Sequence, residues 1–132
     1  MQFDEFIEAV AERADTSRGE AQALVRATLR TLAERISGGE AEDLRAQLPR
    51  ELKGDLASPE ENAQGFDVDE FVRRVAERTG LDETDARARV AAVLSALRDA
   101  VSPGEFDDVL SQLGREFAEL IEAADHRGSR AS

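Results

Sequence analysis

The side chains that carry most enzyme chemistry are scarce in this chain. There is no Cys, and the only His is His126, which lies in the polar C-terminal segment. A solvated His has no packed partner with which to activate a nucleophile or bind haem. The Gly38-Gly39 pair is not followed by the Gly-Lys-Ser/Thr of a phosphate-binding loop. We therefore expect no catalytic residues and no cofactor, and a protein that is not an enzyme.

Carboxylates are the remaining candidates for chemistry. They gather in two acidic patches, which contain Glu40, Glu42 and Asp43, and Glu105, Asp107 and Asp108. Several carboxylates together can bind Mg²⁺ or Ca²⁺. Acids at the start of a helix also stabilise the helix dipole, and the spacing of an EF-hand is absent. We predict helix starts here and no metal site, with a carboxylate enzyme or metal-binding protein as an alternative.

The segments that carry the two patches are copies of each other. Asp4–Leu52 aligns with Asp69–Phe117 at a constant offset of 65 residues without a gap, and 21 of the 49 aligned positions are identical. A copy of this size is marginally stable on its own, so we expect the two copies to pack around one core. The sequence predicts an internal repeat with pseudo-two-fold symmetry.

Within each copy, apolar residues recur at intervals of three and four, as in amphipathic helices. Short polar residues with an acid three positions later mark predicted helix starts at Ser17, Ser37, Asp82 and Ser102. Pro49 marks the start of a short fourth helix with Leu52 and Leu56 facing inward. No segment alternates as a strand does. We predict a compact all-α fold with three to four helices per copy.

The predicted organisation is a single domain over residues 1–124 and a polar tail. The domain comprises repeat one at 2–56, a linker at 53–65 that contains Pro, Ser, Asn and two Gly, and repeat two at 66–124. The tail, residues 125–132, is expected to be disordered.

Two Glu-Arg pairs recur in both copies. They are Glu12-Arg13 with Glu77-Arg78, and Arg50-Glu51 with Arg115-Glu116. We interpret them as an ion-pair network that joins the first and fourth helices. The alternative is that duplication kept surface residues that favour helices.

The combined motifs resemble DUF2267, a family of bacterial and archaeal proteins of uncharacterised function. The matching segments are Phe6–Arg13, Glu20-Ala21, Thr31–Leu44 and Gln47–Pro49 in the first copy, with Glu70-Phe71, Val75–Arg78, Val101–Glu105 and Gln112-Leu113 in the second. The resemblance covers roughly residues 2–122, and Gly114 replaces the Pro that is typical at that position. It implies a compact helical domain and carries no catalytic residues over to this chain.

The charge balance indicates both the environment and the excluded partners. The chain has 29 acidic and 17 basic residues, a net charge of −12, and a single Lys, Lys53, among its basic residues. This excess predicts a halophilic protein, because molar salt shortens the Debye length to about 3 Å and screens the self-repulsion. Codon bias toward Arg is the alternative. The acidity argues against nucleic-acid binding, and without an apolar span or leader we expect a cytoplasmic protein and no membrane partner.

If the halophilic interpretation is right, the unfolding temperature should climb steeply from dilute buffer to molar KCl. Thermal unfolding followed by circular dichroism across a KCl series measures this. A flat response would contradict it and leave the charge excess to codon bias or to a basic partner.

The leading functional hypothesis is a non-enzymatic protein-interaction or regulatory module with an unidentified protein partner. The alternative is a small-molecule-binding domain with a pocket between the repeats, lined by Phe6, Leu29, Phe71 and Leu94. Mimicry of a nucleic acid rests on net charge alone. A homodimer is possible but has no support, because the internal core can absorb every apolar stripe.

Overall fold

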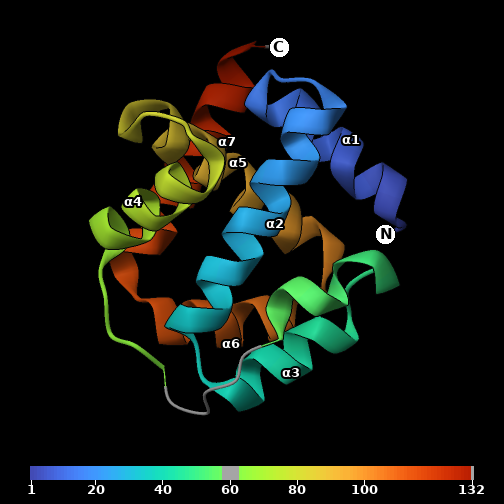
Figure 1. Ribbon diagram of the computed structural model, residues 1–132, viewed down its shortest axis with the longest axis vertical. Helices are drawn as coiled ribbons and strands as arrows, with labels where there is room; N and C mark the ends of the chain where they lie inside the picture. The colour runs from blue at the N-terminus through green and yellow to red at the C-terminus, as the bar shows by residue number, and fades with distance from the viewer. Residues whose placement is uncertain (58–62, 132) are drawn as a thin grey trace.

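The computed structural model describes residues 1–57 and 63–131, and the side chains of residues 126–131 lie outside that description. In the described residues the chain forms helices and no strands (Figure 1). The helices are α1 (Phe3–Ala14), α2 (Arg18–Arg35), α3 (Gly38–Ala46), the 3₁₀ helix η1 (Arg50–Leu56), α4 (Val68–Thr79), α5 (Glu83–Ala100), α6 (Pro103–Leu113) and α7 (Arg115–Ala131). The all-α prediction is confirmed.

Polar caps explain where most of these helices begin. The four predicted caps, Ser17, Ser37, Asp82 and Ser102, each accept a hydrogen bond from the backbone N–H of the third helical residue, and Asp67 caps α4 in the same way. Such a cap satisfies a helix N–H that would otherwise have no partner and stabilises the helix by about 1 kcal/mol. The helix starts are therefore encoded locally.

The two copies differ at the step into their last helix. In the first copy, Pro49 precedes the short 3₁₀ helix η1, in which Leu52 and Leu56 are fully buried as expected. In the second copy, Gly114 takes the equivalent place with φ 96°, a left-handed value that favours glycine. A long α-helix, α7, follows it. The replacement of Pro by Gly therefore accompanies a different type of helix.

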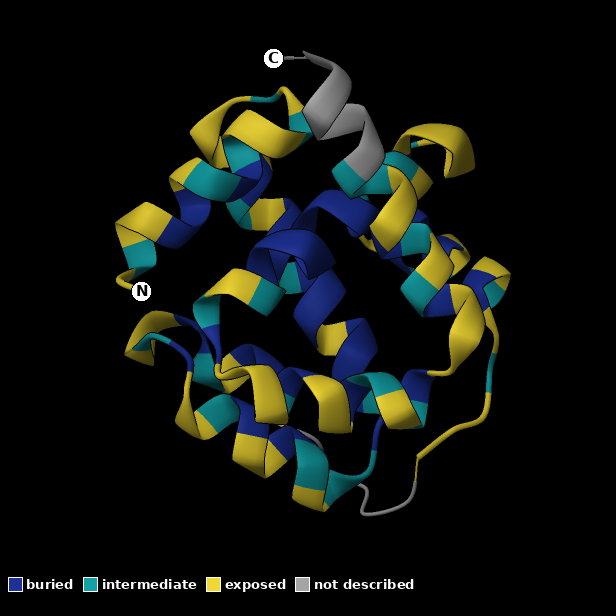
Figure 2. Cartoon of the chain, turned by 180° about the vertical axis from the view of Figure 1, so that it is seen from behind, coloured by how far each residue is buried: buried dark blue, intermediate teal, exposed yellow. Residues whose placement is uncertain are grey.

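The helices α2 and α5 contact each other in the interior, and the shorter helices pack around them (Figures 1 and 2). The first helix of each copy, α1 or α4, contacts the second helix of both copies. In the core, the ring of Phe71 meets that of Phe117 edge to face, with centroids 5.3 Å apart. The described parts of both copies thus contribute to one hydrophobic core.

Arg13 and Arg78, from the recurring Glu-Arg pairs, bind across the copies. The guanidinium of Arg13 on α1 lies 2.5 Å from the Asp99 carboxylate on α5, and Arg78 on α4 lies 2.9 Å from Glu34 on α2. The predicted network between first and fourth helices is therefore wrong for these two residues. The reason is that each first helix crosses the second helix of the other copy, which brings acids at positions 34 and 99 within reach.

The other members of that predicted network do not join it either. Arg115 pairs with Glu119 on its own helix at 3.3 Å, and Glu77 pairs with Arg73 one turn earlier at 2.6 Å. Among the described residues, Arg50 and Glu116 form no ion pair that links α1 to η1 or α4 to α7. These pairs therefore support single helices instead of joining two.

The predicted tail and linker also need correction. Asp125 continues α7 and accepts hydrogen bonds from Arg98 at 2.7 and 2.8 Å, so this residue is not part of a disordered tail. The side chain of His126 lies outside the described residues. At the other boundary, Lys53–Leu56 belongs to η1 instead of the linker. The linker prediction for residues 58–62 falls outside the described residues.

Candidate functional site

The helices α3 and α6, which carry the two acidic patches, lie against each other (Figure 1). Two reciprocal pairs of hydrogen bonds join the start of each helix to the C-terminal end of the other. The Ser37 N–H donates to Gln112 Oε1 at 2.8 Å, and Gln112 Nε2 donates to Ser37 Oγ at 3.1 Å. The Ser102 N–H donates to Gln47 Oε1 at 2.7 Å, and Gln47 Nε2 donates to Ser102 Oγ at 3.3 Å. Each glutamine therefore forms hydrogen bonds with the capping serine of the other helix.

This exchange changes the role of the acid in each first turn. In a self-contained capping box, a Glu three residues after the cap accepts a hydrogen bond from the N–H of the capping residue. Here Gln112 and Gln47 already accept those N–H groups. The carboxyl groups of Glu40 and Glu105 are thus released from local capping. They turn instead toward the contact between the two helices, where they meet.

Glu40, Glu105 and Asp108 form one carboxylate cluster at this contact. One carboxylate oxygen from each lies within 4.8 Å of the others. The Oε1 atoms of Glu40 and Glu105 are buried and have no hydrogen-bond partner among the described residues. Oxygen atoms in this arrangement are the type of ligand that Mg²⁺ and Ca²⁺ bind. The structure therefore brings together acids that lie 65 residues apart in the sequence.

The cluster changes the acidity of one of its members. Burial, the close approach of the Glu105 carboxyl group, and the negative charges of Glu105, Asp108 and Asp43 raise the pKa of Glu40 from 4.5 to about 7. Each of these influences disfavours the ionised carboxylate. No Arg or Lys is among the causes of the shift. Glu40 therefore titrates close to neutral pH.

Six carboxylates on α3 and α6 make up what we call the acidic patch: Glu40, Glu42, Asp43, Glu105, Asp107 and Asp108. None of them forms an ion pair in the part of the chain that the structure describes, whereas acids elsewhere pair repeatedly with Arg. The α6 helix contains no Arg or Lys, and Arg45 is the one cation on α3. The acidic patch thus keeps a negative charge that its own helices do not compensate.

The structure does not place an open pocket where the small-molecule alternative requires one. Phe6, Leu29, Phe71 and Leu94 each have 0% exposed surface and belong to the hydrophobic core. Their side chains pack the space between the repeats. The predicted lining of a ligand pocket is therefore part of the core instead.

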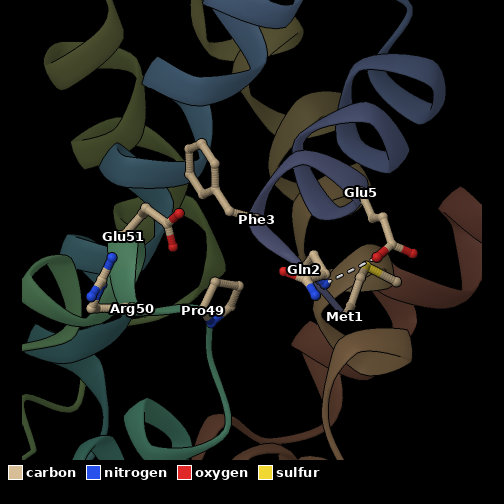
Figure 3. Close-up of a pocket in the computed structure, with 7 residues that line it drawn as sticks. All are labelled: Met1, Gln2, Phe3, Glu5, Pro49, Arg50 and Glu51. Atoms are coloured by element: carbon tan, nitrogen blue, oxygen red, sulfur yellow. Dashed lines mark hydrogen bonds between the residues drawn. The ribbon is translucent and has the colours of Figure 1, made fainter.

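A surface depression of about 760 Å³ lies elsewhere, between the start of α1 and η1 (Figure 3). Its lining residues are Met1, Gln2, Phe3, Glu5, Pro49, Arg50 and Glu51. Around it, the Gln2 N–H donates to Glu5 Oε1 at 3.4 Å, a hydrogen bond that belongs to the cap of α1. The sequence did not indicate this depression, and its polar groups do not form a recognisable catalytic arrangement.

Sequence reasoning identified the six acids and missed the two glutamines that position them. Gln47 and Gln112 stand at equivalent positions of the two copies, each followed by Leu. That identity was the available signal, because a polar residue kept in both copies at a helix end needs a reason. The structure supplies it as a hydrogen bond to the cap of the other copy.

In the described residues, no helix combines the length and apolar character needed to cross a membrane. A search of curated proteins found no match to the chain. A family model described as "Uncharacterized conserved protein (DUF2267)" matches residues 3–120, which is most of the chain. The resemblance found in the sequence is thereby confirmed, and the protein belongs to the DUF2267 family.

Proposed function

We propose that the protein is a non-enzymatic interaction module whose acidic patch binds a partner protein with a basic surface. The observation that carries this proposal is the set of six carboxylates on two adjacent helices without an ion pair among the described residues. Complementary charge accelerates encounter and selects against wrong partners. Binding to the patch would neutralise charge that the fold itself leaves uncompensated.

Charge, rather than apolar contact, is the basis of recognition in this proposal. Among the described residues, Met1 is the one exposed large hydrophobic side chain, with 49% of its surface accessible. Docking of an amphipathic helix requires an apolar groove, and an extended apolar patch marks such a surface. The described surface offers no such extended patch, so the proposed partner is recognised by its Arg and Lys residues.

Two further parts of the proposal concern symmetry and catalysis. Pseudo-two-fold symmetry between the repeats is supported by the reciprocal bonds of Gln47 and Gln112, and by the equivalent pairs Arg13–Asp99 and Arg78–Glu34. The proposal of no catalysis rests on the lack of Cys and on a single His in the sequence.

The proposal predicts that neutralising the patch weakens binding to a basic probe. The variant combines Glu42→Gln, Asp43→Asn, Asp107→Asn and Asp108→Asn, which are four exposed positions. With a fluorescent oligo-arginine peptide in moderate KCl, we expect the dissociation constant to rise about tenfold or more, because the local attraction is lost. Fluorescence anisotropy measures the affinity.

The matched control removes the same number of charges elsewhere. It combines Glu12→Gln, Glu51→Gln, Glu116→Gln and Glu122→Gln, also at exposed positions. This control should bind the peptide nearly as well as the unmodified protein. Equal losses in both variants would show that the peptide responds to net charge alone, and would contradict a binding site at the patch.

A further inference from the structure

The carboxyl groups of Glu40 and Glu105 meet at equivalent positions of the two copies, where α3 contacts α6. One oxygen of each is buried without a hydrogen-bond donor among the described residues. Two ionised carboxylates in such a place repel each other, and a buried acceptor without a donor costs free energy. One proton between them would remove the repulsion and supply the missing donor.

We propose that Glu40 and Glu105 share one proton in the folded protein, and that loss of this proton above neutral pH loosens the contact between α3 and α6. The pair then acts as a pH-sensitive latch on the two helices that carry the acidic patch. Its protonated form is closed. Its ionised form has one more negative charge, and its two carboxylates repel each other.

The nearest charged groups reinforce the repulsion. Asp108 belongs to the same carboxylate cluster, and Asp43 adds a further negative charge. Both act against ionisation of Glu40. The pair therefore sits in a negative environment on α3 and on α6.

Many of the charged groups on the neighbouring elements are engaged elsewhere. On α2, Arg35 donates to the carbonyls of Phe66 and Leu113. Further charged residues on α2, η1 and α7 are engaged in ion pairs. These are Glu34 with Arg74 and Arg78, Asp55 with Arg26 and Arg30, and Arg115 with Glu119. In the described residues, no other charged side chain on α3, α6, η1 or the start of α7 forms an ion pair with Glu40 or Glu105. These side chains are Glu42, Arg45, Asp107, Arg50, Glu51, Lys53 and Glu116. Among the described residues no basic side chain neutralises the pair, so we assign that role to a proton.

The pKa of Glu40 fixes the pH range in which the latch operates. Burial first, then the close approach of the Glu105 carboxyl group and the nearby negative charges, raise this pKa from 4.5 to about 7. Between these two values the folded state binds more protons than the unfolded state. Stability therefore falls as pH rises through this range. In the folded protein the latch is closed below about pH 7, where Glu40 is protonated, and open above it.

The direct test is an NMR titration of the Glu side-chain carboxyl carbons, recorded with EDTA so that trace divalent cations do not compete. We expect the Glu40 signal to titrate with a midpoint near 7. In the variant Glu105→Gln the midpoint should fall by one pH unit or more, because the amide donates to the ionised Glu40. The matched control Glu42→Gln, on the same helix but outside the cluster, should leave it unchanged. A midpoint near 4.5 in the unmodified protein would overturn the proposal.

A second readout follows the contact itself. The backbone amides of Ser37 and Ser102 donate to the glutamines that join α3 and α6, so their hydrogen-exchange protection reports opening of the contact. After correction for intrinsic exchange, their protection should fall severalfold between pH 6 and pH 8.5. Glu40→Gln, which mimics the protonated side chain, should remove this fall, whereas Glu42→Gln should retain it. The same pH dependence in both variants would overturn the latch even if Glu40 titrates as expected.

Discussion

Replacing Phe71 with Ala is expected to lower the free energy of unfolding by about 3–5 kcal/mol. Phe71 is completely buried, and its ring meets those of Phe117 at 5.3 Å and Phe66 at 6.3 Å between centroids. Phe71 lies on α4 and Phe117 on α7, so truncation opens a cavity between these elements. Urea unfolding followed by circular dichroism measures the loss.

The companion variant is Phe66→Ala. Phe66 is only partly buried, and the guanidinium of Arg74 covers its ring at 3.8 Å from the centroid. Because a partly buried ring loses less packing when truncated, Phe66→Ala should lower the free energy of unfolding clearly less than Phe71→Ala does. If both variants lowered the free energy of unfolding by the same small amount, the conclusion that Phe71 is central to the core would be contradicted.

The second large effect concerns Asp55, whose side chain is 4% exposed and accepts hydrogen bonds from Arg26 at 2.7 Å and Arg30 at 3.1 Å. Through these hydrogen bonds the Asp55 carboxylate connects η1 to α2. Replacing Asp55 with Ala should destabilise the protein by about 1–3 kcal/mol, measured by the same urea unfolding. The value stays below that of a fully buried ion pair because both arginines reach solvent.

The second repeat supplies a matched control for this site. At the aligned positions of Arg26 and Arg30 it has Ala91 and Ser95, and the same offset of 65, continued past the aligned segment, places Leu120 opposite Asp55. The triple variant Arg26→Ala, Arg30→Ser and Asp55→Leu therefore removes all three charges together and uses the residue types of the second repeat. We expect it to recover most of the stability lost in Asp55→Ala, because an ion pair replaced as a whole leaves no charge without a partner. A triple variant as unstable as the single one would contradict this account of the pairing.

Local signals in the sequence predicted the helices well. Ser17, Ser37, Asp82 and Ser102 cap helices because a short polar side chain reaches the first free N–H groups from its own segment. The inward positions of Phe6 and Val10 follow from helical periodicity alone. Each of these features depends on residues within a few positions of one another, so one sequence suffices to identify it.

Contacts between distant segments were harder to predict. Arg13 binds Asp99 because α1 crosses α5, and no local pattern encodes that crossing. The spacing of Ser37 and Glu40 predicts a self-contained cap, but Gln112 from the other copy takes the N–H of Ser37. The tertiary contact prevails over the local one, and this is why the carboxylate cluster could not be predicted from spacing.

The central claim is that the acidic patch on α3 and α6 is the binding surface. An NMR titration of the backbone amides with an oligo-arginine peptide tests it most directly, because the shifted signals locate the bound peptide. The account predicts changes concentrated in residues 38–46 and 103–113, with much weaker changes in the four-charge patch variant. Shifts spread evenly over the surface, or centred on another pair of helices, would contradict it.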